Sequence, residues 1–202
     1  MSDIRDLIHT LAIGNEDLAF FSALPSVQPY LSNTSHYQTI PFISRHDRGQ
    51  KHDQFFKKTI NTHDTVPRVL TFMRRPDITS NHEDRSPEPH FTVFAQLESG
   101  INGWEETAHG GVLATLFDEA LGLCAEVYRA FTNGFKETGL LYTATLEVTY
   151  RAPVLTPSVI QIQTWVKRIE GRKWFLEAKI LDQEGAVRAE ARSLYVSQRA
   201  GL

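Results

Sequence analysis

The sequence predicts an α+β fold in which one long helix is held by an antiparallel β-sheet. Residues 110–128 place apolar side chains around most of a helical wheel, so this helix must be wrapped by other elements. Four segments after residue 140 alternate apolar and polar side chains, which is typical of antiparallel strands with one solvated face. The chain has 202 residues, of which 41% are hydrophobic, and this suffices for one domain with an extension.

The expected helix has a broad apolar arc and one narrow arc of different character. The narrow arc is formed by small and acidic residues, namely Gly111, Thr115, Asp118, Glu119, Gly122 and Glu126. Because small residues permit close approach, we expect a ligand or a second chain to reach the helix on this side. The apolar arc is expected to form the hydrophobic centre of the domain.

The expected strands follow the helix in series and form a meander. Their ranges are 141–151, 159–169, 173–181 and 187–196, and glycine-containing turns at 170–172 and 182–185 join the last three. The first strand has Thr143 on its polar face, and its other face consists of Tyr142, Ala144, Leu146, Val148 and Tyr150. Two further strand candidates, 69–73 and 91–97, precede the helix.

The chain changes character near residue 66, which divides it into residues 1–65 and residues 66–202. The first part begins with an amphipathic segment at 4–11 and continues as a polar stretch interrupted by prolines. We therefore expect an N-terminal extension with one short helix and irregular segments, followed by the main domain. The segment 74–89 is rich in proline and polar residues, which predicts an exposed loop.

Composition limits the partners and the compartment. The net charge of −3 and the lack of a dominant basic stripe argue against nucleic acid as the main partner. No run of about 18 apolar residues predicts a membrane span. Cys124 is the single cysteine, which fits a reducing compartment, and the N-terminus resembles neither a signal peptide nor a transit peptide. A cytoplasmic protein is expected, with a mitochondrial location as the alternative.

The start of the helix carries the residues that suggest chemistry. His109, Gly110 and Gly111 open the helix, and Asp118 lies two turns further on. The glycines allow a ligand to approach the N–H groups, where the helix dipole favours negative charge. A donor to an oxyanion and an acid/base group on one helix suggest acyl transfer. The eight histidines show no metal-binding spacing, so neither a metal nor a redox cofactor is expected.

The chain resembles the acyl-CoA thioesterases of the hotdog fold, especially the subgroup that contains the carboxyl-terminal modulator protein. The resemblance rests on His109-Gly110-Gly111, on Asp118 at its spacing, on segment 143–153 (TATLEVTYRAP) and on hairpin 170–175 (EGRKWF). It extends from near residue 69 to residue 197 and leaves out the N-terminal part. It implies an antiparallel sheet wrapped around a central helix, with two protomers side by side and two active sites at their interface.

The resemblance implies catalytic roles for four residues. The backbone N–H of Gly110 would polarise the thioester carbonyl as an oxyanion donor. Asp118, supplied by the other subunit, would act as a general base on water or attack the acyl carbon directly. Thr143 would hold the attacking water or orient Asp118, and His109 would fix the loop and contact the thioester region.

Further residues are expected to bind the substrate. Arg151, Arg172 and Lys173 are cations that can pair with the phosphates of coenzyme A, and Gly111 lies beside the oxyanion donor. Relatives often carry an Asn or Gln several residues before the His, where this chain has Gly103. The adjacent Asn102 takes this role through a shift of one residue, unless the role is absent here.

The expected function is hydrolysis of acyl-CoA thioesters to free acid and coenzyme A by a homodimer or a dimer of dimers. Coenzyme A is part of the substrate, and no separate cofactor is expected. The alternative is a non-catalytic acyl-CoA-binding or protein-interaction module of the same fold, which the departure at Gly103 motivates. A hydratase or dehydratase of this fold is a third reading. The sequence leaves open the acyl chain length, a carrier-protein thioester in place of coenzyme A, and dimer against tetramer.

Overall fold

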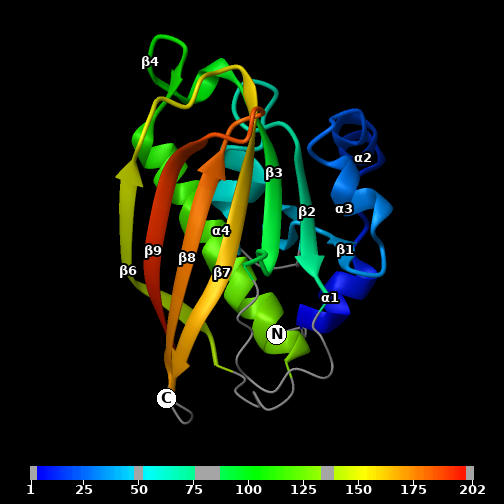
Figure 1. Cartoon of the computed structure of the whole chain (residues 1–202), viewed down its shortest axis with the longest axis vertical. Coiled ribbons are helices and arrows are strands. Elements are labelled where there is room, and N and C mark those ends of the chain that lie inside the picture. Colours follow the sequence, from blue (N-terminus) through cyan, green and yellow to red (C-terminus); the bar gives the residue numbers. More distant parts are fainter. Residues whose placement is uncertain (1–3, 48–51, 76–86, 133–138, 199–202) are drawn as a thin grey trace.

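The computed structural model describes residues 4–47, 52–75, 87–132 and 139–198. Within these residues, the main feature is a seven-stranded antiparallel sheet that curves around the long helix α4 (Gly110–Phe131), as Figure 1 shows. The strand order is β1-β2-β3-β7-β8-β9-β6. The strands are β1 (Tyr37–Ile40), β2 (Val69–Arg74), β3 (Phe91–Leu97), β6 (Leu141–Tyr150), β7 (Ser158–Glu170), β8 (Lys173–Leu181) and β9 (Val187–Ser197).

Short elements surround this sheet. A small hairpin of β4 and β5 immediately precedes α4, and the sequence pattern did not predict it. The remaining elements are α1 (Ile4–Thr10), α2 (Asn15–Ser22), α3 (Gln28–Ser32), η1 (Ile43–Arg45), η2 (Phe55–Thr59), η3 (Ser99–Ile101), β4 (Asn102–Trp104) and β5 (Thr107–Ala108). In the part of the chain that is described, no helix is long and apolar enough to cross a membrane.

Helix α4 and the concave face of the sheet form the main core. Phe117, Leu121 and Cys124 of the apolar arc are at most 1% exposed, and they share one cluster with Trp174 and Ile180 of β8. Each large side chain buried in this way contributes about 1.5–3 kcal/mol. The prediction of a central helix enclosed by an antiparallel sheet, and with it the hotdog fold class, is confirmed.

The predicted meander is correct for three of the four strands after α4. Strands β7, β8 and β9 are consecutive neighbours, but β6 pairs with β9 and not with β7. The chain leaves β6 at the end of the sheet near the start of α4 and crosses to β7 through residues 151–157 (Figure 1). Strand β6 therefore forms one edge of the sheet, and most of its residues are exposed.

A β-bulge interrupts the regular alternation of β6. Leu194 and Tyr195 are adjacent in β9, but their partners in β6 are Thr145 and Thr143, so Ala144 is an extra residue in β6. An extra residue in one strand moves every side chain beyond it to the opposite face of the sheet. Thr143 thus faces α4 on the same side as Leu146. The predicted placement of Thr143 on the polar face is wrong, and so is that of Tyr142 and Ala144 on the face of Leu146.

Helices α2 and α3 of the N-terminal part pack on the side of the sheet opposite α4. Phe21 of α2 and Val27, both 0% exposed, form a second cluster with Phe72 of β2 and Phe94 of β3. Figure 1 shows α2 and α3 beside these strands. The N-terminal part is more regular than expected, because it contains three helices and a strand of the sheet, where one helix and irregular segments were predicted. The boundary at residue 66 stays a prediction.

The N-terminal part also contacts α4 itself. The hydroxyl of Ser44 donates to the carboxylate of Glu119, the residue after Asp118. The guanidinium of Arg45 donates to the carbonyl oxygens of Val66 and Pro67, and burial lowers the pKa of Arg45 to about 10. Most of the expected loop at 74–89 lies outside the described residues.

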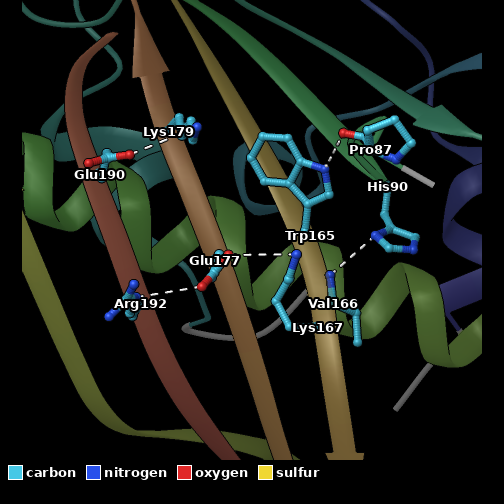
Figure 2. A network of polar contacts seen from close by, with 9 residues as sticks. All are labelled: Pro87, His90, Trp165, Val166, Lys167, Glu177, Lys179, Glu190 and Arg192. Carbon is cyan, nitrogen blue, oxygen red and sulfur yellow. Dashed lines mark hydrogen bonds and ion pairs between the residues drawn. The ribbon is translucent and has the colours of Figure 1, made fainter. Parts of the chain in front are cut away.

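The outer face of β7, β8 and β9 is polar, as Figure 2 shows. Glu177 on β8 lies 3.7 Å from Lys167 on β7 and 3.5 Å from Arg192 on β9. Lys179 lies 3.9 Å from Glu190. Exposed pairs of this kind contribute about 0–1 kcal/mol each, so they mark a solvated face more than they stabilise it. The predicted solvated face of these strands is confirmed.

Candidate active site

Among the described residues, one backbone N–H group at the start of α4 has no hydrogen-bond acceptor. His109 is the N-cap residue, and its Nδ1 accepts a hydrogen bond from the amide of Gly111 at 2.9 Å. The amides of Val112 and Leu113 donate to the carbonyl oxygen of His109. Among the described residues, the amide of Gly110 has no acceptor. Of the first four N–H groups of the helix, which lack partners within it, Gly110 therefore keeps the donor that is free for a ligand.

The imidazole of His109 has a defined role in this arrangement. Because Nδ1 accepts a hydrogen bond, the neutral ring carries its proton on Nε2. The same bond uses the amide of Gly111, so a substrate contact of Gly111 would involve other atoms of that residue. His109 thus fixes the start of the helix, as the sequence suggested.

Tyr150, at the end of β6, lies against Gly110. Its hydroxyl donates to the carbonyl oxygen of Gly110 at 2.6 Å. A Cβ atom at position 110 would lie 3.2 Å from Cζ of Tyr150, so glycine permits this close approach. The sequence analysis did not include Tyr150 among the site residues, although it is the last residue of the predicted strand face.

Gly103 and Asn102 lie beside the start of α4, next to His109. A Cβ atom at position 103 would lie 2.8 Å from Cδ2 of His109, so no larger residue fits there without a shift. The amide oxygen of the exposed Asn102 accepts a hydrogen bond from the hydroxyl of Thr156. Asn102 is close to His109, since the amide of His109 donates to the carbonyl oxygen of Ile101.

Asp118 is half-buried and is held by two hydroxyl groups. Thr143 donates to its Oδ1 at 2.8 Å, and the hydroxyl of Tyr195 lies 2.9 Å from the same oxygen. The hydroxyl of Tyr195 also lies 2.5 Å from the main-chain oxygen of Asp118, so its single proton is shared between two acceptors. Asp118 therefore faces β6 and β9 from the narrow arc of α4. Sequence reasoning selected Thr143 but missed Tyr195.

Tyr195 remains protonated because of its surroundings. The residue is 3% exposed, and burial raises its pKa far above the usual range, with the charge of Asp118 adding to the effect. It can therefore only donate to the carboxylate. Gly122, one turn after Asp118, lies next to this ring, so part of the narrow arc is covered by Tyr195 and not by a ligand.

Gly110 and Asp118 are too far apart to act on the same carbonyl group. Eight residues of α-helix separate them, which corresponds to about 12 Å along the axis. An oxyanion donor lies about 3 Å from the oxygen, and a base or nucleophile lies about 3–3.5 Å from the water or carbon. Within one chain, the amide of Gly110 and the carboxylate of Asp118 therefore do not meet at one carbonyl group.

The three predicted phosphate-binding cations do not lie together. Arg151 follows β6 near the start of α4 and is ion-paired with Glu190 at 2.7 Å. The hydrogen bond from Arg151 is the main cause that lowers the pKa of Glu190. Arg172 donates to the carbonyl oxygen of Ser197 at 2.8 Å, and Lys173 follows it as the first residue of β8.

Arg172 and Lys173 lie at the opposite end of the sheet from Gly110. Ser197 is paired with Leu141 at the start of β6, whereas Tyr150 at its end contacts Gly110. A strand of this length spans about 30 Å. Within one chain, Arg151 alone of the three cations is close to Gly110.

A small cavity lies in the main core, among the described residues. A cavity of about 10 Å³ lies between α4 and β2, β3 and β7, bordered by Phe42 and Arg45 of the N-terminal part. This volume holds about one water molecule and no acyl chain. Among the described residues, no three His, Cys, Asp or Glu side chains are grouped as metal ligands would be.

The architecture defines a hotdog protein with a carboxylate on its central helix and an available amide at the start of that helix. Residues 105–189 match the family model described as "Thioesterase superfamily", and this stretch includes α4, strands β6, β7 and β8 and the start of β9. This part of the chain, which is less than half of it, is therefore similar to thioesterase-superfamily domains, and the resemblance in the sequence indicated the same superfamily.

Individual relatives are similar over different lengths. "Verlamelin biosynthesis protein B" from Lecanicillium sp is 24% identical over 210 positions, which cover 91% of this chain and 89% of that protein. "Acyl-coenzyme A thioesterase THEM4" from Rattus norvegicus is 31% identical over 97 residues, 48% of this chain. The aligned part spans 38% of the rat protein, less than half of its length. The solved structure of the E. coli PaaI protein is 13% identical, with a TM-score of 0.47, over 54% of this chain and 72% of that one.

Proposed function

We propose that the protein hydrolyses acyl-CoA thioesters to a carboxylic acid and coenzyme A. The observation that carries the proposal is the carboxylate of Asp118, which two hydroxyls hold on the central helix of a domain similar to those of the thioesterase superfamily. The similarity to a rat protein named as an acyl-coenzyme A thioesterase supports this substrate class. The free amide of Gly110 supplies the second group that the reaction needs.

Two forms of the reaction fit the site. In the first, Asp118 takes a proton from water while the water oxygen bonds to the acyl carbon. In the second, a carboxylate oxygen of Asp118 bonds to the acyl carbon, and water then hydrolyses the resulting anhydride. In both, the amide of Gly110 stabilises the negative charge on the carbonyl oxygen, the carbon–sulfur bond breaks, and coenzyme A leaves as a thiolate that is then protonated.

The reaction requires a second copy of the chain. Because Gly110 and Asp118 of one chain are about 12 Å apart, Gly110 of one protomer is proposed to act with Asp118 of its partner. The exposed edge of β6 is the surface that a second copy can extend, since an unpaired strand edge is a template for pairing. Two such sites form in a homodimer, and a dimer of dimers is compatible with them.

Coenzyme A belongs to the substrate, and water is the co-substrate, so the proposed chemistry uses no separate cofactor. His109 positions the helix start, Thr143 orients Asp118, and Arg151 and Asn102 are proposed to contact the substrate near Gly110. Arg172 and Lys173 are proposed to meet the phosphates from the partner subunit. A cytoplasmic location is proposed on the basis of the single buried thiol, Cys124.

The test is thiol release from a panel of acyl-CoAs of increasing chain length, with wild type, Asp118→Asn and Glu119→Gln. Glu119→Gln is the matched control, because it changes the neighbouring carboxylate on α4 and keeps an acceptor for Ser44. We expect Asp118→Asn to lower kcat by about 100- to 10,000-fold and Glu119→Gln to change it little. Full activity of Asp118→Asn refutes the mechanism.

The alternative function is a non-catalytic module that binds acyl-CoA or a protein. Position 103 favours it, since the close packing on His109 leaves no space there for an amide side chain. Acyl-CoA that binds in calorimetry and remains intact for hours would establish this alternative. Turnover of any acyl-CoA by the wild type, lost in Asp118→Asn, eliminates it. Formation of an enoyl product without thiol release would instead indicate a hydratase or dehydratase.

A further inference from the structure

Tyr195 is buried, and the hydrogen-bond partners of its hydroxyl among the described residues all belong to the candidate site. It lies on the inner face of β9, where its neighbours on that face are Ser193, Ala191 and Ala189. The ring extends from this row of small residues toward α4, and the hydroxyl reaches both the carboxylate and the main-chain oxygen of Asp118. A phenylalanine would fill the same space, so the hydroxyl itself requires an explanation.

Tyr195 and Thr143 act on the same atom. They are partners across β9 and β6, and the bulge at Ala144 turns Thr143 to the face on which Tyr195 lies. Directly opposite residues point to the same side of a sheet. Both hydroxyls consequently reach Oδ1 of Asp118, whereas Oδ2 has no hydrogen-bond partner among the described residues.

The two oxygens of Asp118 are therefore unequal. Hydrogen bonds from O–H groups to a carboxylate are short and strong, and they stabilise the charge on the oxygen that accepts them. The lone pairs of an oxygen with two such bonds are occupied. The other oxygen keeps its lone pairs available, and its direction is fixed because the carboxylate cannot rotate without breaking both bonds.

We propose that Tyr195 is a positioning residue of the thioester site: with Thr143 it holds Oδ1 of Asp118, so that Oδ2 is the atom that meets the water or the acyl carbon. This inference rests on the proposed hydrolase function. Tyr195 touches Asp118 and not the substrate, and it acts by fixing which oxygen reacts and where that oxygen lies. Its second bond, to the main-chain oxygen of Asp118, fixes α4 against β9 at the same point.

The kinetic test compares Tyr195→Phe with Tyr30→Phe. Tyr30 is the matched control, because its hydroxyl accepts a hydrogen bond from Gln161 at 2.7 Å on the other side of the sheet. For an acyl-CoA that the wild type hydrolyses, we expect Tyr195→Phe to lower kcat by about 10- to 100-fold, because a small misplacement of a reacting group has effects of this size. KM should change less than about threefold, and Tyr30→Phe should change neither constant.

The double variant Tyr195→Phe/Thr143→Val separates positioning from a general loss of structure. Since both hydroxyls act on one oxygen, their effects on kcat should not multiply, because groups that share a partner are coupled. Independent, multiplying effects on kcat, or an increase of KM alone, overturn the proposal. Circular dichroism spectra of all variants confirm that each one is folded before its rates are compared.

A measurement without turnover distinguishes this inference from the proposed function. The infrared difference between wild type and Asp118→Asn isolates the carboxylate band of Asp118. We expect Tyr195→Phe to shift this band and Tyr30→Phe to leave it in place. An unshifted band together with an unchanged kcat shows that Tyr195 does not hold the carboxylate. A shifted band in a protein that releases no thiol from any acyl-CoA refutes the hydrolase, while the contact itself stands.

Discussion

Because α2 packs on the sheet through Phe21, we expect Phe21→Ala to lower the stability of the protein. Phe21 is 0% exposed and its ring lies 6.4 Å from that of Phe94 on β3. Truncation of a buried phenylalanine costs about 3–5 kcal/mol. In a chain of this length, about 1 kcal/mol corresponds to about 2–4 °C, so Tm should fall by about 6–20 °C. This loss is a large part of the about 5–15 kcal/mol that stabilises a typical protein.

The assay is urea and thermal unfolding followed by tryptophan fluorescence, since Trp165 and Trp174 lie on β7 and β8. Leu18→Ala is the control on the same helix, because Leu18 is 37% exposed and its truncation should cost about 0.5 kcal/mol or less. If Phe21→Ala leaves the fluorescence transition unchanged, the N-terminal part unfolds independently of β7 and β8 and the reasoning is wrong.

Three further predictions concern the site, a turn and the thiol. Gly110→Ala should lower kcat by about 10- to 100-fold, because the new methyl group displaces the ring of Tyr150, and thiol release measures this. Asp182 is partly buried, which raises its pKa, but hydrogen bonds from Ala186 and Arg188 outweigh this and hold the pKa below its usual 3.8. The contribution of Asp182 to the free energy of unfolding is thus present above pH 3.8 and is lost as the pH falls through its lower pKa in the folded state. In urea unfolding, Asp182→Asn should therefore cost about 1–2 kcal/mol at pH 7 and almost nothing in strong acid. Burial raises the pKa of Cys124 to about 12, so Ellman's reagent should label this thiol only after unfolding; rapid labelling of the native protein contradicts its burial.

The elements with long local patterns could be predicted from the sequence. Helix α4 repeats its apolar residues over more than five turns, and the strand range 173–181 agrees with β8 at both ends. Such periodicity results from burial of one face and needs no knowledge of the partner. The same holds for the N-cap arrangement of His109, Gly110 and Gly111, which depends on neighbours in the chain.

The contacts between distant residues could not be predicted in this way. Tyr195 and Asp118 are 77 residues apart, and they meet only because β9 runs between β8 and β6 on the inner side of the sheet. No local pattern specifies that β6 pairs with β9, since an alternating strand fits beside several neighbours. The short helices α2 and α3 were missed for a related reason, because helices of this length are stabilised by packing more than by their own sequence.

The bulge at Ala144 determines which face of β6 carries Thr143, and deletions in β6 test this. With Ala144 as the extra residue, its deletion should restore a regular ladder and keep Thr143 opposite Tyr195, so kcat should stay within about tenfold of the wild type. Deletion of the exposed Glu147, in the regular part of β6, is the matched control. It should turn Leu146 and Thr143 outward and abolish activity, because a shift of one residue exchanges the two faces of a strand. The opposite result, an active Glu147 deletion and an inactive Ala144 deletion, would mean that β6 alternates regularly and that Thr143 does not face Asp118.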